Sequence, residues 1–289
     1  MRRWIVFIQC IIFLATGNLA RGWGNEGHVL INRAAAATIV PGDFGNFIQV
    51  FADSLALHAP DPDSWKKGDR EEGYRHFIDI DLYSEYPFSD LPATQAELEQ
   101  RYGREQVRKN GIAPYYIDQY CRRISDLLAA GQWQPALIPL AALGHYVADL
   151  HMPLHTVANY NGQLTGNDGI HFRWEIGLLE KYPPTVTAAG AVDSIADPLQ
   201  ECFTIVRESY LVHGRILRAD SLARQVLAPA DREILKTYNP LPDDTEYYAV
   251  LERESGQLAR EQLNLASQRV ASFWYYCWIA AGRPQPPNR

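Results

Sequence analysis

The segment HYVADLHMPLH, residues 145–155, constrains this chain most, because it places three histidines and an aspartate directly after an apolar run. The preceding residues, QPALIPLAALG, carry Leu, Ile and Ala at helical spacing, which predicts a buried helix over 134–152. His145 and Asp149 are four residues apart, so both project from one face of that helix. Pro153 disfavours continuation of the helix and leaves His155 at or just past its end. A buried helix does not carry such groups without a partner, and a metal ion is one such partner.

Helical patterns dominate the rest of the chain, and strand signals are few. The predicted helices span roughly 26–40, 44–57, 93–109, 114–130, 134–152, 172–180, 197–212, 220–227 and 246–281. Pro- and Gly-rich loops separate them, and no internal repeat or linker divides the chain. We therefore expect an all-α fold, with a single multi-helix domain over 23–289 and functional loops at one end.

The first 22 residues need a separate reading. Two arginines precede an apolar stretch over 4–15, and Ala20 and Gly22 stand at the −3 and −1 positions of a cut before Trp23. Residues 1–22 are therefore predicted to be a signal peptide, which implies a secreted or periplasmic protein. The apolar run is too short and too one-sided for a typical membrane anchor, although an uncleaved anchor is the alternative.

The charge balance excludes a general polyanion binder. The 289 residues carry 27 basic and 34 acidic side chains, a net charge of −7. Removal of residues 1–22 takes away three arginines and no acids, which leaves a net charge of −10. Any bound phosphate must then be held by a local site, which again suggests metal. Cys121, Cys202 and Cys277 are far apart, so a thiolate zinc site is not expected, and their disulfide pairing stays open.

Four other stretches supply possible metal ligands. WGNEGH offers His28, HAPDPDSW offers Asp61 and Asp63, RHFIDID offers His76, Asp79 and Asp81, and GIHFRWE offers His171 and Glu175. Each stretch is a weak signal alone, because a single buried histidine is usually a hydrogen-bonded core residue. Two His-carboxylate pairs at helical i,i+4 spacing strengthen the case for a shared cation. Imidazole and carboxylate ligands favour zinc, while iron and manganese also accept them.

The ordered set of motifs resembles the S1/P1 nuclease and zinc-dependent phospholipase C superfamily. The resemblance runs from Trp23 to Glu175 and consists of W-G-x-x-G-H, then D…H-F-I-D, then H-x-x-x-D-x-x-x-x-x-H, then H-x-x-x-E. It implies an all-helical fold that binds three zinc ions and hydrolyses phosphodiesters.

The resemblance also implies a ligand set. It assigns His76, His145, Asp149 and Asp61 to the first zinc, His155, His171 and Glu175 to the second, and the α-amine and carbonyl of Trp23 with His28 and a shared Asp149 to the third. Asp61 is chosen because its 15-residue distance to His76 looks like the nuclease spacing, and Asp63 is the reserve. The third site requires signal-peptide cleavage, since only then does Trp23 have a free amine.

The implied mechanism is attack by metal-bound hydroxide on phosphorus. Asp149 would serve two metals and is therefore expected to be essential for catalysis. Asp81 is expected to orient the attacking water, with an ordinary loop carboxylate as the alternative.

The substrate prediction rests on mixed features. Glu175 looks like the phospholipase pattern, whereas the five-residue step from Trp23 to His28 looks like the nucleases. We expect a nuclease acting on single-stranded nucleic acid, with Trp65, Tyr74 or Tyr160 available to stack on bases. The alternatives are a phospholipase C and, from a different class, a zinc-binding protein without turnover. No protein partner is implied, and we expect a monomer.

Overall fold

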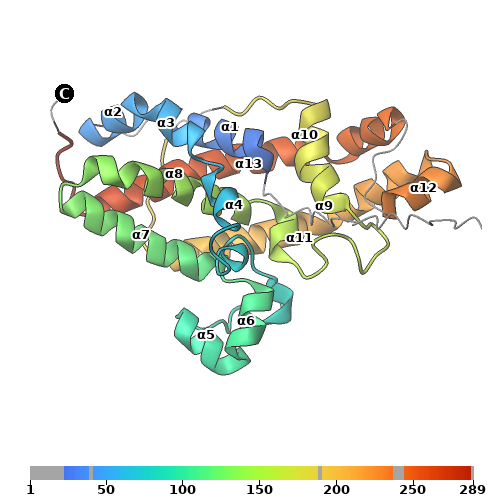
Figure 1. The fold of residues 1–289 in the computed structure, drawn as a ribbon, viewed down its shortest axis with the longest axis horizontal. Coiled ribbons are helices and arrows are strands. Elements are labelled where there is room, and N and C mark those ends of the chain that lie inside the picture. Colours follow the sequence, from blue (N-terminus) through green and yellow to red (C-terminus); the bar gives the residue numbers. More distant parts are fainter. Residues whose placement is uncertain (1–22, 39–41, 188–190, 237–243, 288–289) are drawn as a thin grey trace, which may run out of the picture.

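The computed structural model describes residues 23–38, 42–187, 191–236 and 244–287 (Figure 1). The predicted signal peptide, residues 1–22, lies outside the described residues and stays a prediction. The elements are α1 (Gly24–Ala37), α2 (Asp43–Val50), α3 (Ala52–Leu57), α4 (Asp61–Trp65), η1 (Gly73–Arg75), η2 (Ile80–Leu82), α5 (Gln95–Tyr102), α6 (Arg104–Asn110), α7 (Ala113–Ala129), α8 (Trp133–Leu150), η3 (Pro153–Thr156), α9 (Ile170–Phe172), the π-helical turn η4 (Arg173–Gly177), α10 (Leu178–Lys181), α11 (Pro198–Gln225), α12 (Pro229–Lys236) and α13 (Thr245–Ala280). No strand occurs among these residues, so the all-α prediction is confirmed.

Helix α8 lies at the centre of the bundle, packed against α1, α7 and α13 (Figure 1). Its side chains are apolar around most of the circumference, and nearly all of them are buried. A helix of this composition is stable only when neighbours cover every face. The last two turns of α8 therefore carry His145 and Asp149 into the interior, where both are fully buried.

Helix α1 is fixed against α8 by two polar contacts. The Trp23 indole Nε1 donates to the Ala148 carbonyl at 2.9 Å, next to Asp149 in the chain. The Asn32 side-chain amide donates to the carbonyls of Leu55 and Ala141 at 3.0 and 3.1 Å. Asn32 fits because α8 has Gly144 opposite it, where a Cβ would collide with the amide. These contacts hold α1 in the register that turns His28 toward α8.

Several predicted helices differ from the structure. The segment 44–57 is divided into α2 and α3, 172–180 consists of the end of α9, η4 and α10, and α12 was not predicted. The segment 93–109 is two helices, α5 and α6, because Gly103 adopts φ 84° between them, a conformation that glycine tolerates. Conversely, 197–212 and 220–227 belong to the single helix α11. Burial of Ile216 and Ala219 against the bundle outweighs the helix-breaking tendency of Gly214, which is worth about 1 kcal/mol.

Cys121, Cys202 and Cys277 are buried and form no disulfide in the described part of the chain. Across the same residues, no helix combines the length and apolar character that crossing a membrane requires.

Candidate metal centre

Three groups of buried ligand-type side chains meet where α8 ends. They are His28, His145 and Asp149; then Asp63, His76 and His145; then His155, His171 and Glu175. Within each group the ligand atoms all lie within 4.8 Å of one another. The side chains come from α1, α4, α8, η3, α9 and η4 and from the residue that follows η1, so distant parts of the sequence converge on one place.

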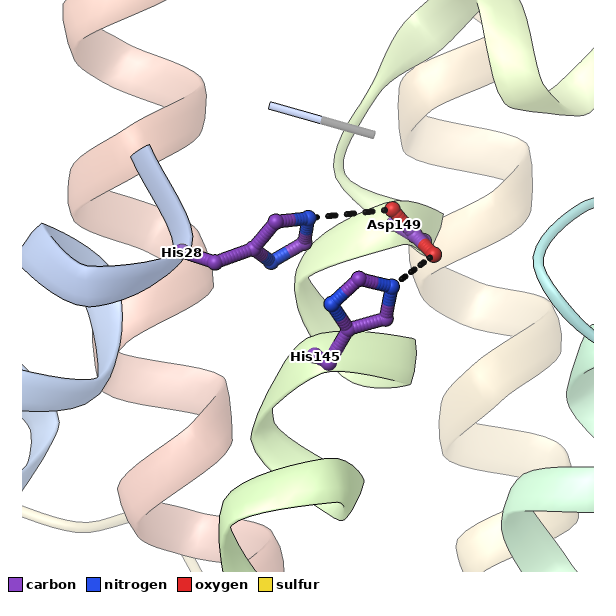
Figure 2. A group of neighbouring side chains, drawn as sticks. All are labelled: His28, His145 and Asp149. Carbon is purple, nitrogen blue, oxygen red and sulfur yellow. Dashed lines mark ion pairs between the residues drawn. The ribbon is translucent and has the colours of Figure 1, made fainter. Parts of the chain in front are cut away.

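The first group lies between α1 and α8 (Figure 2). His28 Nε2 is 3.6 Å from Asp149 Oδ1, and the imidazole rings of His28 and His145 stack with centroids 3.8 Å apart. His145 Nε2 lies 3.2 Å from the other carboxylate oxygen of Asp149. Two imidazoles therefore face one carboxylate from the same side.

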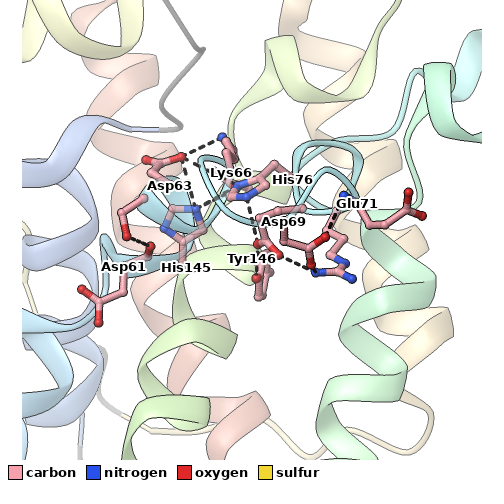
Figure 3. Close-up of polar contacts among 12 residues, drawn as sticks. Asp61, Asp63, Lys66, Asp69, Glu71, His76, His145 and Tyr146 are labelled. Carbon is pink, nitrogen blue, oxygen red and sulfur yellow. Dashed lines mark hydrogen bonds and ion pairs between the residues drawn. The ribbon is translucent and has the colours of Figure 1, made fainter.

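The second group joins α4, the residue that follows η1, and α8 (Figure 3). His145 Nε2 is 3.0 Å from His76 Nδ1, and each of these nitrogens is 3.9 Å from Asp63 Oδ1. His76 Nδ1 is also 2.9 Å from Asp149 Oδ2. Asp149 thus belongs to this group as well as to the first.

The third group is built on the turn after α8 and on the short α9–η4 segment. His171 Nε2 lies 3.1 Å from His155 Nε2 and 2.9 Å from Glu175 Oε2. His155 Nε2 is 3.7 Å from the same glutamate oxygen. The predicted i,i+4 pair of His171 and Glu175 therefore faces His155 as expected.

Asp149 connects the three groups. Its Oδ2 contacts His76 and His145, whereas its Oδ1 lies 3.6 Å from both His28 Nε2 and His155 Nδ1. Burial would raise the pKa of this carboxyl, but its interactions with the surrounding imidazoles, chiefly His145, hold the pKa well below its ordinary value. The carboxylate is consequently ionised and available as a ligand.

Backbone carbonyls orient three of the imidazoles. His145 Nδ1 lies 2.9 Å from the Ala59 carbonyl, His155 Nδ1 lies 3.0 Å from the His76 carbonyl, and His171 Nδ1 lies 3.2 Å from the Tyr160 carbonyl. A carbonyl only accepts hydrogen bonds, so each Nδ1 carries the proton and each Nε2 keeps a lone pair for the group.

Glu72 orients the fourth imidazole. Its Oε1 is 3.3 Å from His76 Nε2, and the Tyr146 hydroxyl and the Arg75 guanidinium donate to the same carboxylate. Burial raises the pKa of Glu72, but the hydrogen bonds from His76 and Tyr146 outweigh it and bring the pKa to about 2. Glu72 therefore faces Nε2 of His76, while Nδ1 of the same ring faces Asp63 and Asp149. Sequence reasoning missed Glu72, although its position four residues before His76 on a turn was a usable signal.

The donor set fits divalent cations. Asp63 Oδ2, Asp149 Oδ1 and Glu175 Oε2 are buried oxygens without a hydrogen-bond partner among the described residues. The Nε2 atoms of His155 and His171 lie 3.1 Å apart, close enough for one cation to contact both. Buried groups of this kind are costly alone and become favourable around a metal.

A family model described as S1/P1 Nuclease matches residues 23–273. The chain belongs to the S1/P1 nuclease family. Members of this family are zinc-dependent enzymes that hydrolyse phosphodiesters, which is the activity that the sequence predicts.

The chain resembles solved structures, two of which are alpha-toxins, and a search of curated proteins found no match. One is the alpha toxin from Clostridium absonum, with 12% identity, a TM-score of 0.51, and coverage of 91% of this chain and 65% of that one. The other is the alpha-toxin of Clostridium perfringens from avian strain SWCP, with 12% identity, a TM-score of 0.48 and coverage of 89% and 64%. The chain thus spans slightly less than two thirds of the length of each toxin. The likeness to the first toxin shows the shared helical fold.

The structure brings Asp63 to His76 and His145 and leaves Asp61 outside the three groups, so the choice of Asp61 is corrected. The side chain of Asp63 is 4% exposed and faces His76 and His145, whereas that of Asp61 is 38% exposed and pairs with His58 at 2.8 Å. Both residues lie on the single turn α4, where a two-residue step rotates a side chain by about 200°. Only one of them can face the centre.

Asp81 is not brought to the three groups. It is exposed, and its carboxylate accepts the amide N–H of Ala158 at 2.9 Å, so the structure shows it holding a loop. Asp79 is the buried carboxyl of this stretch, with an Oδ1 that has no hydrogen-bond partner among the described residues. Burial and the neighbouring Asp81 charge raise the pKa of Asp79 to about 7.

Lys66 is a further residue that sequence reasoning did not single out. Its ammonium lies 2.8 Å from Asp63 Oδ1, and its side chain is mostly buried at the edge of the second group. The i,i+3 spacing of Asp63 and Lys66 on α4 was visible in the sequence.

Trp23 stands where α1 begins. Its ring is buried against Trp174, with centroids 5.4 Å apart, and its indole reaches the residue before Asp149. The start of α1 is therefore fixed beside the first group, and main-chain ligation by Trp23 stays a proposal.

Proposed function

We propose that this protein is a secreted zinc-dependent nuclease that cleaves single-stranded nucleic acid. The observation that carries the proposal is the fully buried Asp149, whose two oxygens face histidines of all three groups. The family match supports phosphodiester hydrolysis, and the donor set supports zinc.

The proposed ligand set follows the three groups. Asp63, His76, His145 and Asp149 hold one zinc ion, His155, His171 and Glu175 hold a second, and His28, Asp149 and the main chain of Trp23 hold a third. When bound, zinc supplies positive charge to a phosphodiester and generates hydroxide near neutral pH. The chain itself is acidic, so this local charge is what allows it to bind a polyanion.

Protein side chains have separate tasks in the proposed reaction. Lys66 presents an ammonium at the edge of the centre and binds a non-bridging phosphate oxygen of the substrate. Asp79 is buried, and its pKa of about 7 leaves the carboxyl protonated at lower pH. It exchanges a proton with substrate or water beside the third group. Asp149 keeps the histidines in place throughout.

Tyr160 favours nucleic acid as the substrate. Of the three aromatic residues considered for base stacking, Trp65 and Tyr74 are partly buried, whereas Tyr160 is 45% exposed. Its ring lies 5.8 Å from the His171 ring, so a base stacked on it places the neighbouring phosphate at the centre.

A phospholipase C is the second candidate, because large apolar side chains are exposed on the same segment. Leu164 is 73% exposed, and Phe172, directly after His171, is 49% exposed. Such side chains are suited to contact with lipid tails.

The deciding experiment offers the protein each substrate class. Protein that begins at Trp23 is incubated with denatured DNA, duplex DNA, RNA and phosphatidylcholine vesicles, with and without a zinc chelator. The proposal predicts chelator-sensitive cleavage of single-stranded DNA and RNA, with much slower cleavage of the duplex. Cleavage of phosphatidylcholine alone would replace the nuclease with the phospholipase, and chelator-resistant cleavage would refute both.

A further inference from the structure

A buried carboxylate outside the three groups, Asp220 of α11, collects four hydrogen-bond donors. Asn167 Nδ2 donates to it at 2.7 Å, Arg173 Nη2 at 3.1 Å and Arg224 Nε at 2.6 Å, and the Tyr247 hydroxyl donates as well. Asp220 is fully buried and lies 47 and 53 residues from Arg173 and Asn167 in the chain. Among the contacts of the described residues, it makes none with a proposed metal ligand.

The partners of Asp220 flank the ligands of the third group. Asn167 lies four residues before His171, and Arg173 lies between His171 and Glu175. Arg173 and Arg224 also donate to the same main-chain carbonyl, that of Asp168, each at 2.8 Å. Asp220 therefore fixes both ends of the segment that presents His171.

The turn that carries Glu175 depends on outside support. Residues 173–177 form a π-helical turn, which is rarely stable by itself and occurs mainly at functional sites. Arg173 Nε donates to the Tyr247 hydroxyl at 2.8 Å, and Trp174 Nε1 donates to Ser255 at 3.0 Å. Only glycine fits at position 177, because a Cβ there would collide with the Tyr248 hydroxyl. Helices α11 and α13 thus hold the turn along its length.

The charges explain why Asp220 matters most. Its single carboxylate is paired with the two mostly buried guanidinium groups of Arg173 and Arg224. Without the carboxylate these cations would repel each other in a buried setting, where an uncompensated charge is strongly unfavourable. Arg173 would then move outward and take the neighbouring residues of the turn with it.

We propose that Asp220 is a positioning residue for the metal group of His155, His171 and Glu175. Through Asn167 and Arg173 it holds His171 and Glu175 at the spacing that one cation requires. This inference rests on the proposed function, because it presumes that the group binds zinc.

The test measures zinc affinity on the full chain that begins at Trp23. Metal-free protein is titrated with zinc against a chromophoric chelator, and the ion of this group is identified as the one lost in Glu175→Gln. Asp220→Asn is expected to lower the affinity for that ion by about 10–100-fold, as loss of an outer partner of a metal ligand typically does. The affinities for the other ions are expected to stay unchanged. When Asp220→Asn is combined with Glu175→Gln, we expect no further loss of zinc binding.

Two variants complete the design. Trp274→Phe removes the hydrogen bond from Trp274 Nε1 to the Leu140 carbonyl in the bundle, away from the third group, and controls for general destabilisation. Tyr247→Phe removes one donor to Asp220 and the acceptor of the Arg173 Nε hydrogen bond, while the carboxylate stays in place. We expect a smaller effect in the same direction, and this variant also serves if Asp220→Asn does not fold. Unchanged affinity for this ion in both Asp220→Asn and Tyr247→Phe, or a uniform weakening of all ions as in Trp274→Phe, would overturn the inference. Absence of zinc binding by the unmutated chain would instead refute the proposed function.

Discussion

Asp149 Oδ2 lies 2.9 Å from His76 Nδ1, although the two residues are 73 positions apart in the sequence. The contact joins the end of α8 to the loop region that follows α4, and Glu72 holds the opposite side of the same imidazole. The side chains of Glu72, His76 and Asp149 therefore form a continuous row of contacts across the centre. Such a row fixes which nitrogen of His76 can bind a metal.

Separate substitution of the two α4 aspartates tests which one is a ligand. Asp63→Asn is expected to lose one zinc ion and to lower kcat/KM by more than about 100-fold, since it removes a direct ligand. Asp61→Asn is the matched control, and because its side chain is partly exposed we expect a change below about threefold. Zinc content and steady-state cleavage of denatured DNA check both variants. The reverse ranking would return Asp61 to the centre.

Glu72→Gln tests the orientation of His76. The substitution removes the carboxylate charge that pairs with Arg75 and accepts a hydrogen bond from the Tyr146 hydroxyl, so the imidazole is held less firmly. We expect zinc affinity at the group of Asp63 and His76 to fall about 10–100-fold. Glu71→Gln serves as control because its carboxylate contacts Tyr74 and Arg108 instead. Equal affinity in the two variants would contradict the role given to Glu72.

The raised pKa of Asp79 is expected to make the stability of the zinc-free protein depend on pH. Burial raises the folded-state pKa of this carboxyl from 3.8 to about 7, so between those pH values the folded state binds a proton that the unfolded state has released. The free energy of unfolding therefore falls as pH rises through this window, by an amount of order a few kcal/mol. Asp79→Asn is expected to reduce this dependence, measured as Tm from pH 4 to 7 in chelator. An unchanged slope would show that Asp79 is not the group that titrates.

If the α-amine of Trp23 is a zinc ligand, cleavage of the signal peptide should raise the zinc content. Protein that begins at Trp23 is expected to bind one more zinc ion than protein that keeps a single residue before it, because only the former has a free α-amine. Zinc content measured by elemental analysis, together with turnover, compares the two forms. Equal zinc content and equal turnover would remove the amine from the ligand set.

Local spacing was sufficient for much of the centre. His145 and Asp149 on an apolar helix, and His171 with Glu175, were predicted to share a face, and the structure brings both pairs together. Such pairs are predictable because a helical turn fixes the relation of i and i+4. The buried α8 was predictable for the same reason, since its apolar residues surround it.

Features that depend on tertiary packing were not predictable. Asp61 and Asp63 sit on one turn, and only the position of that turn against α8 decides which faces inward. Asp81 and Asp79 present the same problem, since their exposure depends on the loop at Ala158. Asp220 gave no signal because its partners come from the distant residues 167 and 173 and from α13.

The most direct test of the account locates the ions in crystals of the protein that begins at Trp23. Anomalous diffraction is recorded on both sides of the zinc absorption edge. Zinc peaks are expected at three positions, each within about 2.0–2.2 Å of imidazole nitrogens and carboxylate oxygens of one group, with Asp149 shared between two of them. Crystals of active protein that show no zinc peak beside Asp149 would contradict this expectation.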